Sequence, residues 1–183
     1  MRSLLRLAAR AVRDVRGKLT ILKLRIKGCR VDWSACIDPS ARIEPSGGSI
    51  SIGPRTFIDC GVVIRGLGGN ITIGADCAVN AYTVLCGGGD IRIGDSVMIA
   101  SHVSCYAGNH VYSSVSEPMR TQGLETVGIT MASDVWIGTG VRLLDGVEIG
   151  RGAIVAAGAV VTRSILPLSI NAGVPARVIG TRH

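Results

Sequence analysis

Histidine is the side chain best suited to acid–base chemistry near neutral pH, and the chain contains only three: His102, His110 and His183. His110 lies in the run YAGNHVYSSV, which follows Cys105. An imidazole within hydrogen-bond reach of a hydroxyl can take its proton as the oxygen attacks an electrophile, which accelerates a reaction roughly 10²- to 10⁴-fold. His110 is therefore a candidate general base. The sequence logic leaves a purely structural role equally open.

An internal repeat defines the elements that would position His110. The motifs ISIG, ITIG, IRIG, GITM and VEIG begin at residues 50, 71, 91, 128 and 147. Within each repeat an apolar residue returns at every sixth position, and a small or β-branched residue follows most of these four positions later. The sixth-position series consists of Ile52, Ile58, Ile64, Ile73, Val79, Leu85, Ile93, Ile99, Cys105, Met131, Ile137, Leu143, Ile149, Val155 and Val161.

A period of six fits strands, because an even period keeps the same residues on one face of each strand. Three six-residue sides close a triangular coil of 18 residues, and the spacings between the repeats equal 18 plus insertions of 3, 2, 20 and 0 residues. Stacked coils of this kind form a β-solenoid with its apolar ladders inside. A coil that stays in register accommodates 20 extra residues only as an excursion, so residues 106–127 are predicted to protrude with His110 at their base.

The composition indicates one soluble or peripheral domain. The chain has 183 residues, of which 47% are hydrophobic, 18% charged and 3% aromatic, with 25 glycines. These values exclude a disordered chain, and no apolar stretch approaches the length of a membrane span. The six cysteines form no CxxC pair, which favours buried free thiols over structural disulfides or a zinc site.

The excess of positive over negative charge is confined to the N-terminal segment. Residues 1–30 hold ten of the 20 Lys and Arg residues and one acid, Asp14, whereas a nucleic-acid binder usually spreads its basic face over the fold. Residues 2–16 place arginines on one side of a helical wheel and apolar residues on the other, which predicts a basic amphipathic helix that ends at Gly17. Alternating apolar and basic residues over 22–27 then predict a strand that leads into the solenoid.

Two roles stay open for the predicted helix of residues 2–16. It fits an anionic lipid surface, where each cation contributes about 1 kcal/mol, and it also fits packing on a neighbouring subunit. The first role would hold a cytoplasmic protein at the inner face of the membrane. Three regions are expected in all: the basic segment 1–30, the solenoid 31–166 with its loop 106–127, and a C-terminal segment 167–183.

The six-residue pattern over residues 37–166 resembles the hexapeptide-repeat proteins, whose fold is a left-handed parallel β-helix. The segments IGDSVMIASHVSCYAGNH, PMRTQG, DVWIG and NAGVPARVIG resemble the maltose and galactoside O-acetyltransferases, and PMRTQG also resembles their relatives that acetylate bacterial polysaccharides. The resemblance implies an O-acetyltransferase that uses acetyl-CoA and no metal, with His110 as general base. It also implies a homotrimer, because coenzyme A in this fold lies in a cleft between neighbouring solenoids.

The resemblance extends to individual positions. Asn80 matches the acceptor-binding asparagine, although an asparagine ladder inside the solenoid explains it equally well, and Tyr82 is placed beside it as a second acceptor contact. Trp136 matches a tryptophan near the thiol end of coenzyme A, and backbone N–H groups around Gly138 and Thr139 lie where oxyanion donors are expected. The positions along the pantetheine and phosphates of coenzyme A correspond to Ala157, Thr162, Arg163 and Arg177, and the C-terminal segment would close that groove.

The acceptor is the least defined part of the prediction. The relatives carry an acidic residue a few positions after Asn80, where this chain has the run CGGG at 86–89. The leading hypothesis is a sugar hydroxyl in a cell-surface polysaccharide or its lipid-linked precursor. The alternatives are a soluble sugar, serine or xenobiotic acceptor, and a non-catalytic scaffold. Glu117 and Glu125 are candidates for orienting His110.

Overall fold

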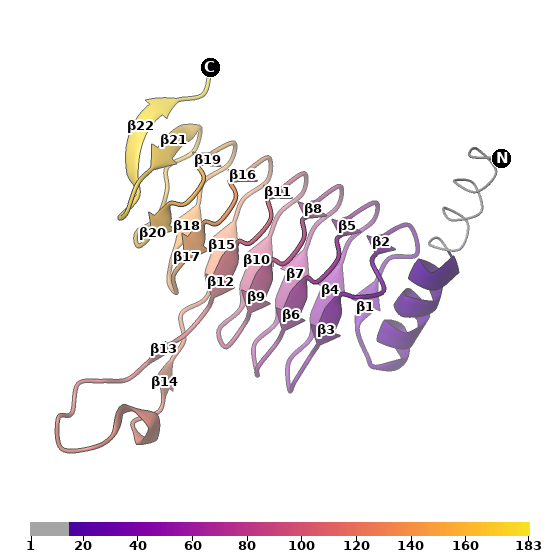
Figure 1. The fold of residues 1–183 in the computed structure, drawn as a ribbon, viewed down its shortest axis with the longest axis horizontal. Helices are drawn as coiled ribbons and strands as arrows, with labels where there is room; N and C mark the ends of the chain where they lie inside the picture. The colour runs from indigo at the N-terminus through magenta and orange to yellow at the C-terminus, as the bar shows by residue number, and fades with distance from the viewer. Residues whose placement is uncertain (1–14) are drawn as a thin grey trace.

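The computed structural model describes residues 15–183, which form a β-solenoid with one N-terminal helix and one protruding loop (Figure 1). The chain passes in turn through three sheets, named here A, B and C. Sheet A comprises β1 (Arg30–Val31), β4 (Ile50–Ile52), β7 (Ile71–Ile73), β10 (Ile91–Ile93), β15 (Ile129–Met131) and β18 (Glu148–Ile149). Sheet B comprises β2 (Cys36–Ile37), β5 (Phe57–Ile58), β8 (Ala78–Val79), β11 (Met98–Ile99), β16 (Trp136–Ile137), β19 (Ile154–Val155), β21 (Ser169–Ala172) and β22 (Arg177–Thr181). Sheet C comprises β3 (Arg42–Glu44), β6 (Val63–Arg65), β9 (Val84–Cys86), β12 (Ser104–Tyr106), β17 (Arg142–Leu143) and β20 (Val160–Val161).

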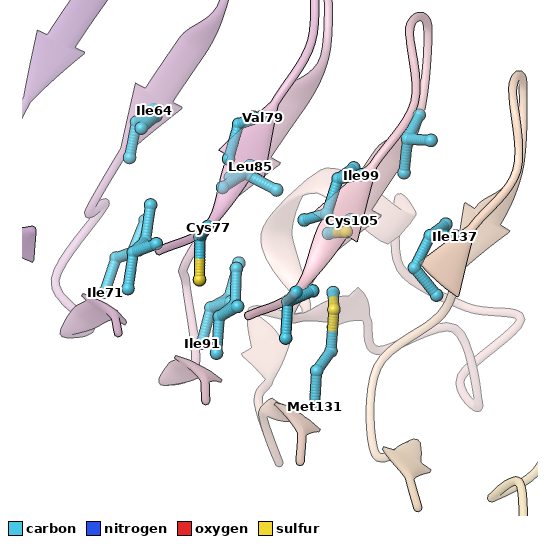
Figure 2. Close-up of a cluster of buried hydrophobic side chains, with 14 of the residues drawn as sticks. Ile64, Ile71, Cys77, Val79, Leu85, Ile91, Ile99, Cys105, Met131 and Ile137 are labelled. Carbon is cyan, nitrogen blue, oxygen red and sulfur yellow. The ribbon is translucent and has the colours of Figure 1, made fainter. Parts of the chain in front are cut away.

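The core consists of the ladders that the sequence predicts. Ile73, Ile93 and Met131 lie in register on successive parallel strands of sheet A, and Val79, Ile99 and Ile137 do so in sheet B. Every member of the sixth-position series is at most 3% exposed. Figure 2 shows side chains of all three sheets meeting inside the coils. The predicted parallel β-solenoid is therefore confirmed.

All the insertions lie at the edge where the chain passes from sheet C to sheet A, named here the C–A edge. The extra residues fall between β3 and β4, between β6 and β7, between β9 and β10, and between β12 and β15. Glycines line this edge because the stacked backbones touch: a Cβ on Gly69 would lie 1.9 Å from the carbonyl oxygen of Gly87. The opposite end of sheet C, where the chain arrives from sheet B, is named the B–C edge.

The predicted loop over residues 106–127 is present and protrudes from the solenoid wall (Figure 1). It contains β13 (Asn109–His110), the short 3₁₀ helix η1 (Met119–Thr121) and β14 (Leu124–Glu125). β13 and β14 pair antiparallel, which makes the base of the loop a two-stranded stalk.

The prediction that a helix ends at Gly17 and a strand follows is wrong, because residues 15–26 form one continuous helix. Gly17, Ile21 and Leu24 are its buried residues and are spaced by four and three positions, a helical period that the alternation over 22–27 had obscured. Gly17 lies within the helix at a close approach, since a Cβ there would lie 3.3 Å from the carbonyl oxygen of Ile37.

Gly28 ends this helix in the left-handed conformation, at φ +87°. The N–H of Gly28 donates to the carbonyl of Arg25, and the N–H of Cys29 donates to that of Leu24, both at 3.0 Å, which is the Schellman arrangement. The predicted basic helix of residues 2–16 lies outside the described residues except for its last two positions. No helix within residues 15–183 is both long and apolar enough to span a bilayer.

The C-terminal segment folds over one end of sheet B. β21 continues the sheet in parallel, and β22 returns antiparallel to it (Figure 1). Arg182 forms an ion pair with Asp134 at 2.8 Å, which ties the end of the chain to an earlier coil.

Candidate functional site

His110 lies on the exposed stalk of the loop, at the C–A edge. In the antiparallel pairing of β13 with β14, His110 stands opposite Leu124 and Asn109 stands opposite Glu125. A hollow of about 650 Å³ at this place is lined by Asn109, His110, Val111, Tyr112, Ser113 and Glu125. The imidazole is thus accessible to a bound molecule, as a general base requires.

Two residues that the sequence analysis did not single out hold the loop in shape. The Gln122 side chain accepts from the Ser114 N–H at 3.0 Å and donates to the carbonyls of Ser114 and Glu117, both at 2.9 Å. The Asp145 carboxylate accepts from the backbone N–H groups of residues 127 and 128, at 2.9 and 2.8 Å, where the loop rejoins the solenoid. The only sequence signal for Gln122 was its place in the PMRTQG segment.

The two candidates for orienting His110 differ in position. Glu125 lines the same hollow as His110, whereas Glu117 contributes its backbone carbonyl to the Gln122 amide. Across residues 15–183, no side chain forms a hydrogen bond with the His110 ring. Glu125 is therefore the better placed of the two carboxylates, but within one chain the imidazole has no fixed partner.

The residues predicted for the acceptor lie at the B–C edge. The Asn80 amide donates to the carbonyl of Ile99 at 2.8 Å and is half-buried, so part of its role is structural. Tyr82 is exposed, and its ring stacks on His102 of the next coil with centroids 5.3 Å apart. His102, which the sequence analysis left without a role, thus belongs to the same surface. The signal for it is the 20-residue spacing from Tyr82, which equals one coil with its insertion.

The two predicted oxyanion donors, the N–H groups of Gly138 and Thr139, lie on the next coil and differ in their hydrogen bonding. The Gly138 N–H donates to the Val155 carbonyl at 2.7 Å, so the stacking of the coils already uses this donor. A Cβ on Gly138 would lie 2.6 Å from the Ala157 nitrogen, which explains the glycine. Thr139 is exposed, and its N–H has no acceptor within residues 15–183.

The residues predicted for coenzyme A divide between two edges. Trp136 is 48% exposed on the outer face of sheet B, and Ala157 is exposed on the B–C edge that follows. Arg177 begins β22, next to the turn that bonds to Val160 on this edge. Thr162 and Arg163 are also exposed, but they follow β20 and lie at the C–A edge with the loop.

The structure therefore gathers the candidate residues into two groups. The B–C group consists of Asn80, Tyr82, Trp136, Gly138, Thr139, Ala157 and Arg177, and the C–A group consists of His110, Thr162 and Arg163. A side of the coil separates the two edges, and six residues at about 3.3 Å each span roughly 20 Å. Within a single chain, His110 therefore lies far from the residues of the B–C group.

Burial works against a nucleophilic role for Cys86 and Cys105. All six are free, and Cys29, Cys77 and Cys105 are buried while Cys36 is exposed. Burial raises the pKa of the Cys105 thiol to about 12 and also raises that of Cys86, so both stay protonated at neutral pH. No three His, Cys, Asp or Glu side chains of residues 15–183 converge on a point where they could share a metal ion.

Known proteins share the repeat and the fold of this chain. Residues 128–163 match the bacterial transferase hexapeptide family, described as six repeats. The chain is 36% identical over 113 residues to the galactoside O-acetyltransferase of Escherichia coli (strain K12), which covers 61% of this chain and 54% of that protein. It is 29% identical over 178 residues to WbbJ of the same organism, a provisionally named lipopolysaccharide biosynthesis O-acetyl transferase, covering 93% and 86% of the two chains.

Among solved structures, the fold superimposes on a mutant of AntD, an N-acyltransferase from Bacillus cereus, in complex with dTDP-4-amino-4,6-dideoxyglucose and coenzyme A. The TM-score is 0.75 and the identity 29%, over 88% of each chain. The predicted resemblance to hexapeptide-repeat acyltransferases is thereby confirmed. The chain spans only about half the length of several of its curated relatives, including the galactoside enzyme.

Proposed function

We propose that this chain, a solenoid that carries bacterial transferase hexapeptide repeats, is an acetyl-CoA-dependent O-acetyltransferase that acts on a sugar hydroxyl. The observation that carries the proposal is the placement of an exposed imidazole and an unused backbone donor on two different edges of the solenoid. Each edge holds half of an acyl-transfer site. The relatives named as galactoside and lipopolysaccharide O-acetyltransferases support the reaction class.

The two half-sites explain why the active form would be a homotrimer. When the C–A edge of one chain meets the B–C edge of the next, the contact is heterologous, and a closed ring of three satisfies every edge. The outer face of sheet B supports this packing, because its residues are apolar in every coil. This ladder consists of Cys36, Phe57, Ala78, Met98, Trp136, Ile154 and Ile170. The exposed apolar side chains of the loop offer a matching surface, and they include Tyr112, Val115 and Leu124.

The chemistry in the shared cleft follows from the groups on each side. His110 accepts the proton of the acceptor hydroxyl as the oxygen attacks the thioester carbonyl, and it returns that proton to the departing sulfur, so no covalent enzyme intermediate is required. The Thr139 N–H of the adjacent chain donates to the carbonyl oxygen while it carries negative charge. Arg163 and Arg177 supply exposed guanidinium groups for phosphates of coenzyme A.

The acceptor class proposed is a sugar of a cell-surface polysaccharide or its lipid-linked precursor. The match to WbbJ supports this class, because it extends over most of both chains. The second candidate is a small nucleotide-linked sugar, since the AntD structure that superimposes on this chain is named as a complex with one. A contact of residues 2–16 with the membrane, predicted from the sequence, stays a prediction for a segment outside the described residues.

Release of free thiol from acetyl-CoA tests the activity across a panel of free sugars, nucleotide sugars and lipid-linked oligosaccharides. We expect turnover with at least one saccharide. The absence of thiol release with every acceptor, together with no binding of acetyl-CoA, would indicate a non-catalytic scaffold.

Mixing two inactive variants tests the shared site. His110→Ala lacks the base at the C–A edge, and the double variant Asn80→Ala, Trp136→Ala lacks the B–C group. In a randomly mixed ring, about one interface in four joins two intact edges, so co-refolded variants should regain roughly a quarter of wild-type turnover. Each variant refolded alone is the control. A mixture as inactive as its components would place the whole site within one chain.

A further inference from the structure

The outward side of the N-terminal helix carries a continuous apolar stripe. Val15, Leu19, Leu22 and Ile26 follow one another at intervals of four, three and four residues, so they share one side of the helix. Their exposed fractions range from 45% to 77%, and nothing within residues 15–183 covers them. The buried residues Gly17, Ile21 and Leu24 lie on the opposite side, against the solenoid. Within residues 15–183 the stripe is therefore left exposed.

Trp33 extends this stripe. A hollow of about 380 Å³ between the helix and the indole is lined by Val15, Lys18, Leu19, Leu22 and Trp33. The Lys18 ammonium donates to the Trp33 carbonyl oxygen, and the Arg25 guanidinium carbon lies 5.0 Å from the centroid of the indole ring. These contacts hold an exposed tryptophan at the border of an apolar surface, the position that tryptophan favours at membrane–water interfaces.

Cations border the stripe on both sides. At 100° per residue, three basic residues fall on one flank of the helix and two on the other. They are Arg16, Lys23 and Lys27 on the first flank and Lys18 and Arg25 on the second. Residues 15–31 contain no Asp or Glu, so no acid along this segment offsets the charge. An apolar stripe between two basic flanks is the pattern of a helix that lies in the plane of a membrane interface.

A second hollow lies beside the first flank. It measures about 370 Å³ between the helix and the turn at residues 39–44. Arg16, Lys23, Lys27 and Arg42 line it with a single carboxylate, Glu44, which is paired with Arg42 at 3.0 Å. The excess of cations suits a phosphate-bearing headgroup.

We propose that the helix of residues 15–26, together with Trp33, is a docking surface for an anionic phospholipid bilayer. The stripe and the indole enter the boundary between headgroups and acyl chains, and the two basic flanks face the headgroup phosphates. A second copy of this chain is the less suitable occupant, because joining two such surfaces would bring their excess cations together. The proposal assigns the membrane contact to residues 15–33, which overlap only at residues 15 and 16 with the segment 2–16, for which the sequence leaves a lipid surface and a neighbouring subunit equally open.

This surface also fits the proposed ring. The helix lies at the N-terminal end of the solenoid, away from the C-terminal hairpin of β21 and β22 (Figure 1). In a ring with cyclic symmetry the three helices would lie at the same end, so one assembly would present three contacts to a single membrane and gain avidity. This step rests on the proposed function, whereas the docking surface itself does not.

Vesicle co-sedimentation of the full-length chain tests the proposal, and it requires no acyl transfer. We expect binding to phosphatidylcholine vesicles that contain phosphatidylglycerol, little binding to phosphatidylcholine alone, and loss of binding at high salt. The variant Leu19→Ser, Ile26→Ser keeps every charge and should weaken binding at least about tenfold. Its matched control is Leu166→Ser, Leu168→Ser, an exposed leucine pair at the other end of the solenoid, which should bind like the wild type.

A second variant, Lys23→Gln, Lys27→Gln, tests the contribution of the cations to vesicle binding. Each cation near an anionic surface contributes about 1 kcal/mol, so the pair should weaken binding roughly thirtyfold. Far-ultraviolet circular dichroism and size-exclusion chromatography check that the variants keep fold and assembly. Undiminished vesicle binding by the Leu19, Ile26 variant, or equal binding to neutral vesicles, would overturn the proposal. If the wild type did not bind vesicles and the Leu19, Ile26 variant formed a smaller assembly than the wild type, the stripe would join two copies of the chain instead.

Discussion

The rings of Tyr82 and His102 stack at the B–C edge, with their planes 15° from parallel. Both residues adopt φ +60°, at a corner where other coils have Gly61 and Gly140. The Tyr82 ring lies close over Gly61, so its other face is covered as well. Gly140 leaves open space where a side chain would be, on the next coil after His102. His102 is therefore the last ring of this aromatic stack, one coil from Thr139.

This stack predicts a role for His102 in acceptor binding. A sugar ring could lie against the imidazole, beside the Thr139 N–H, and His102→Ala should raise the KM for the acceptor about tenfold while the KM for acetyl-CoA stays unchanged. His102→Phe keeps an aromatic face and should retain most of the affinity. Steady-state kinetics with each substrate varied in turn checks the split. If the alanine variant lost kcat alone, the stack would not be an acceptor surface.

His110→Ala should lower turnover at least about 100-fold, because the acceptor hydroxyl would lose its base. Acetyl-CoA affinity, measured by calorimetry, should be nearly unchanged, since the imidazole acts on the acceptor. The control is His183→Ala, which removes an exposed histidine at the end of the chain. Near-normal turnover of the His110 variant would remove this residue from the mechanism.

Trp136 should report the bound coenzyme directly, because the chain has only one other tryptophan, Trp33. In a Trp33→Phe background, coenzyme A should change the fluorescence of Trp136. With Trp33 retained, Trp136→Phe should abolish the change, and Trp136→Ala should raise the KM for acetyl-CoA about tenfold through loss of the aromatic wall. A fluorescence response that survives in the Trp136→Phe chain would place the cofactor elsewhere.

The neighbouring residues Leu143 and Leu144 test the ladder model of stability. Leu143 is fully buried in the sheet C ladder, whereas Leu144 is 40% exposed. Leu143→Ala should lower the free energy of unfolding by about 2–5 kcal/mol through lost contacts and a cavity, while Leu144→Ala should cost less than about 1 kcal/mol. Urea unfolding at a fixed protein concentration measures both. Similar losses for the two variants would contradict the assigned register.

The ladders could be predicted from the sequence because the pleat of a strand is local. An even period of six requires no knowledge of distant residues, so the sequence predicts core positions such as Ile73, Ile93 and Met131, and a loop at the insertion after Cys105. The predicted strand at residues 22–27 is wrong, because the apolar residues of this segment fit both a strand period and a helical period. Ile21 and Leu24 are buried against the solenoid and Leu22 is exposed, which is the pattern of a helix.

Only the tertiary structure decided how the candidate site is divided. Residues 80 and 110 lie 30 positions apart in the chain, but that spacing does not state that one follows sheet B and the other follows sheet C. Nor does it state that coil stacking consumes the Gly138 N–H and leaves that of Thr139 free. Hydrogen bonds between coils depend on which backbone segments lie next to each other, and these segments become neighbours only when the chain folds into the solenoid. The residue types therefore set the available chemistry, and the winding set which groups can meet.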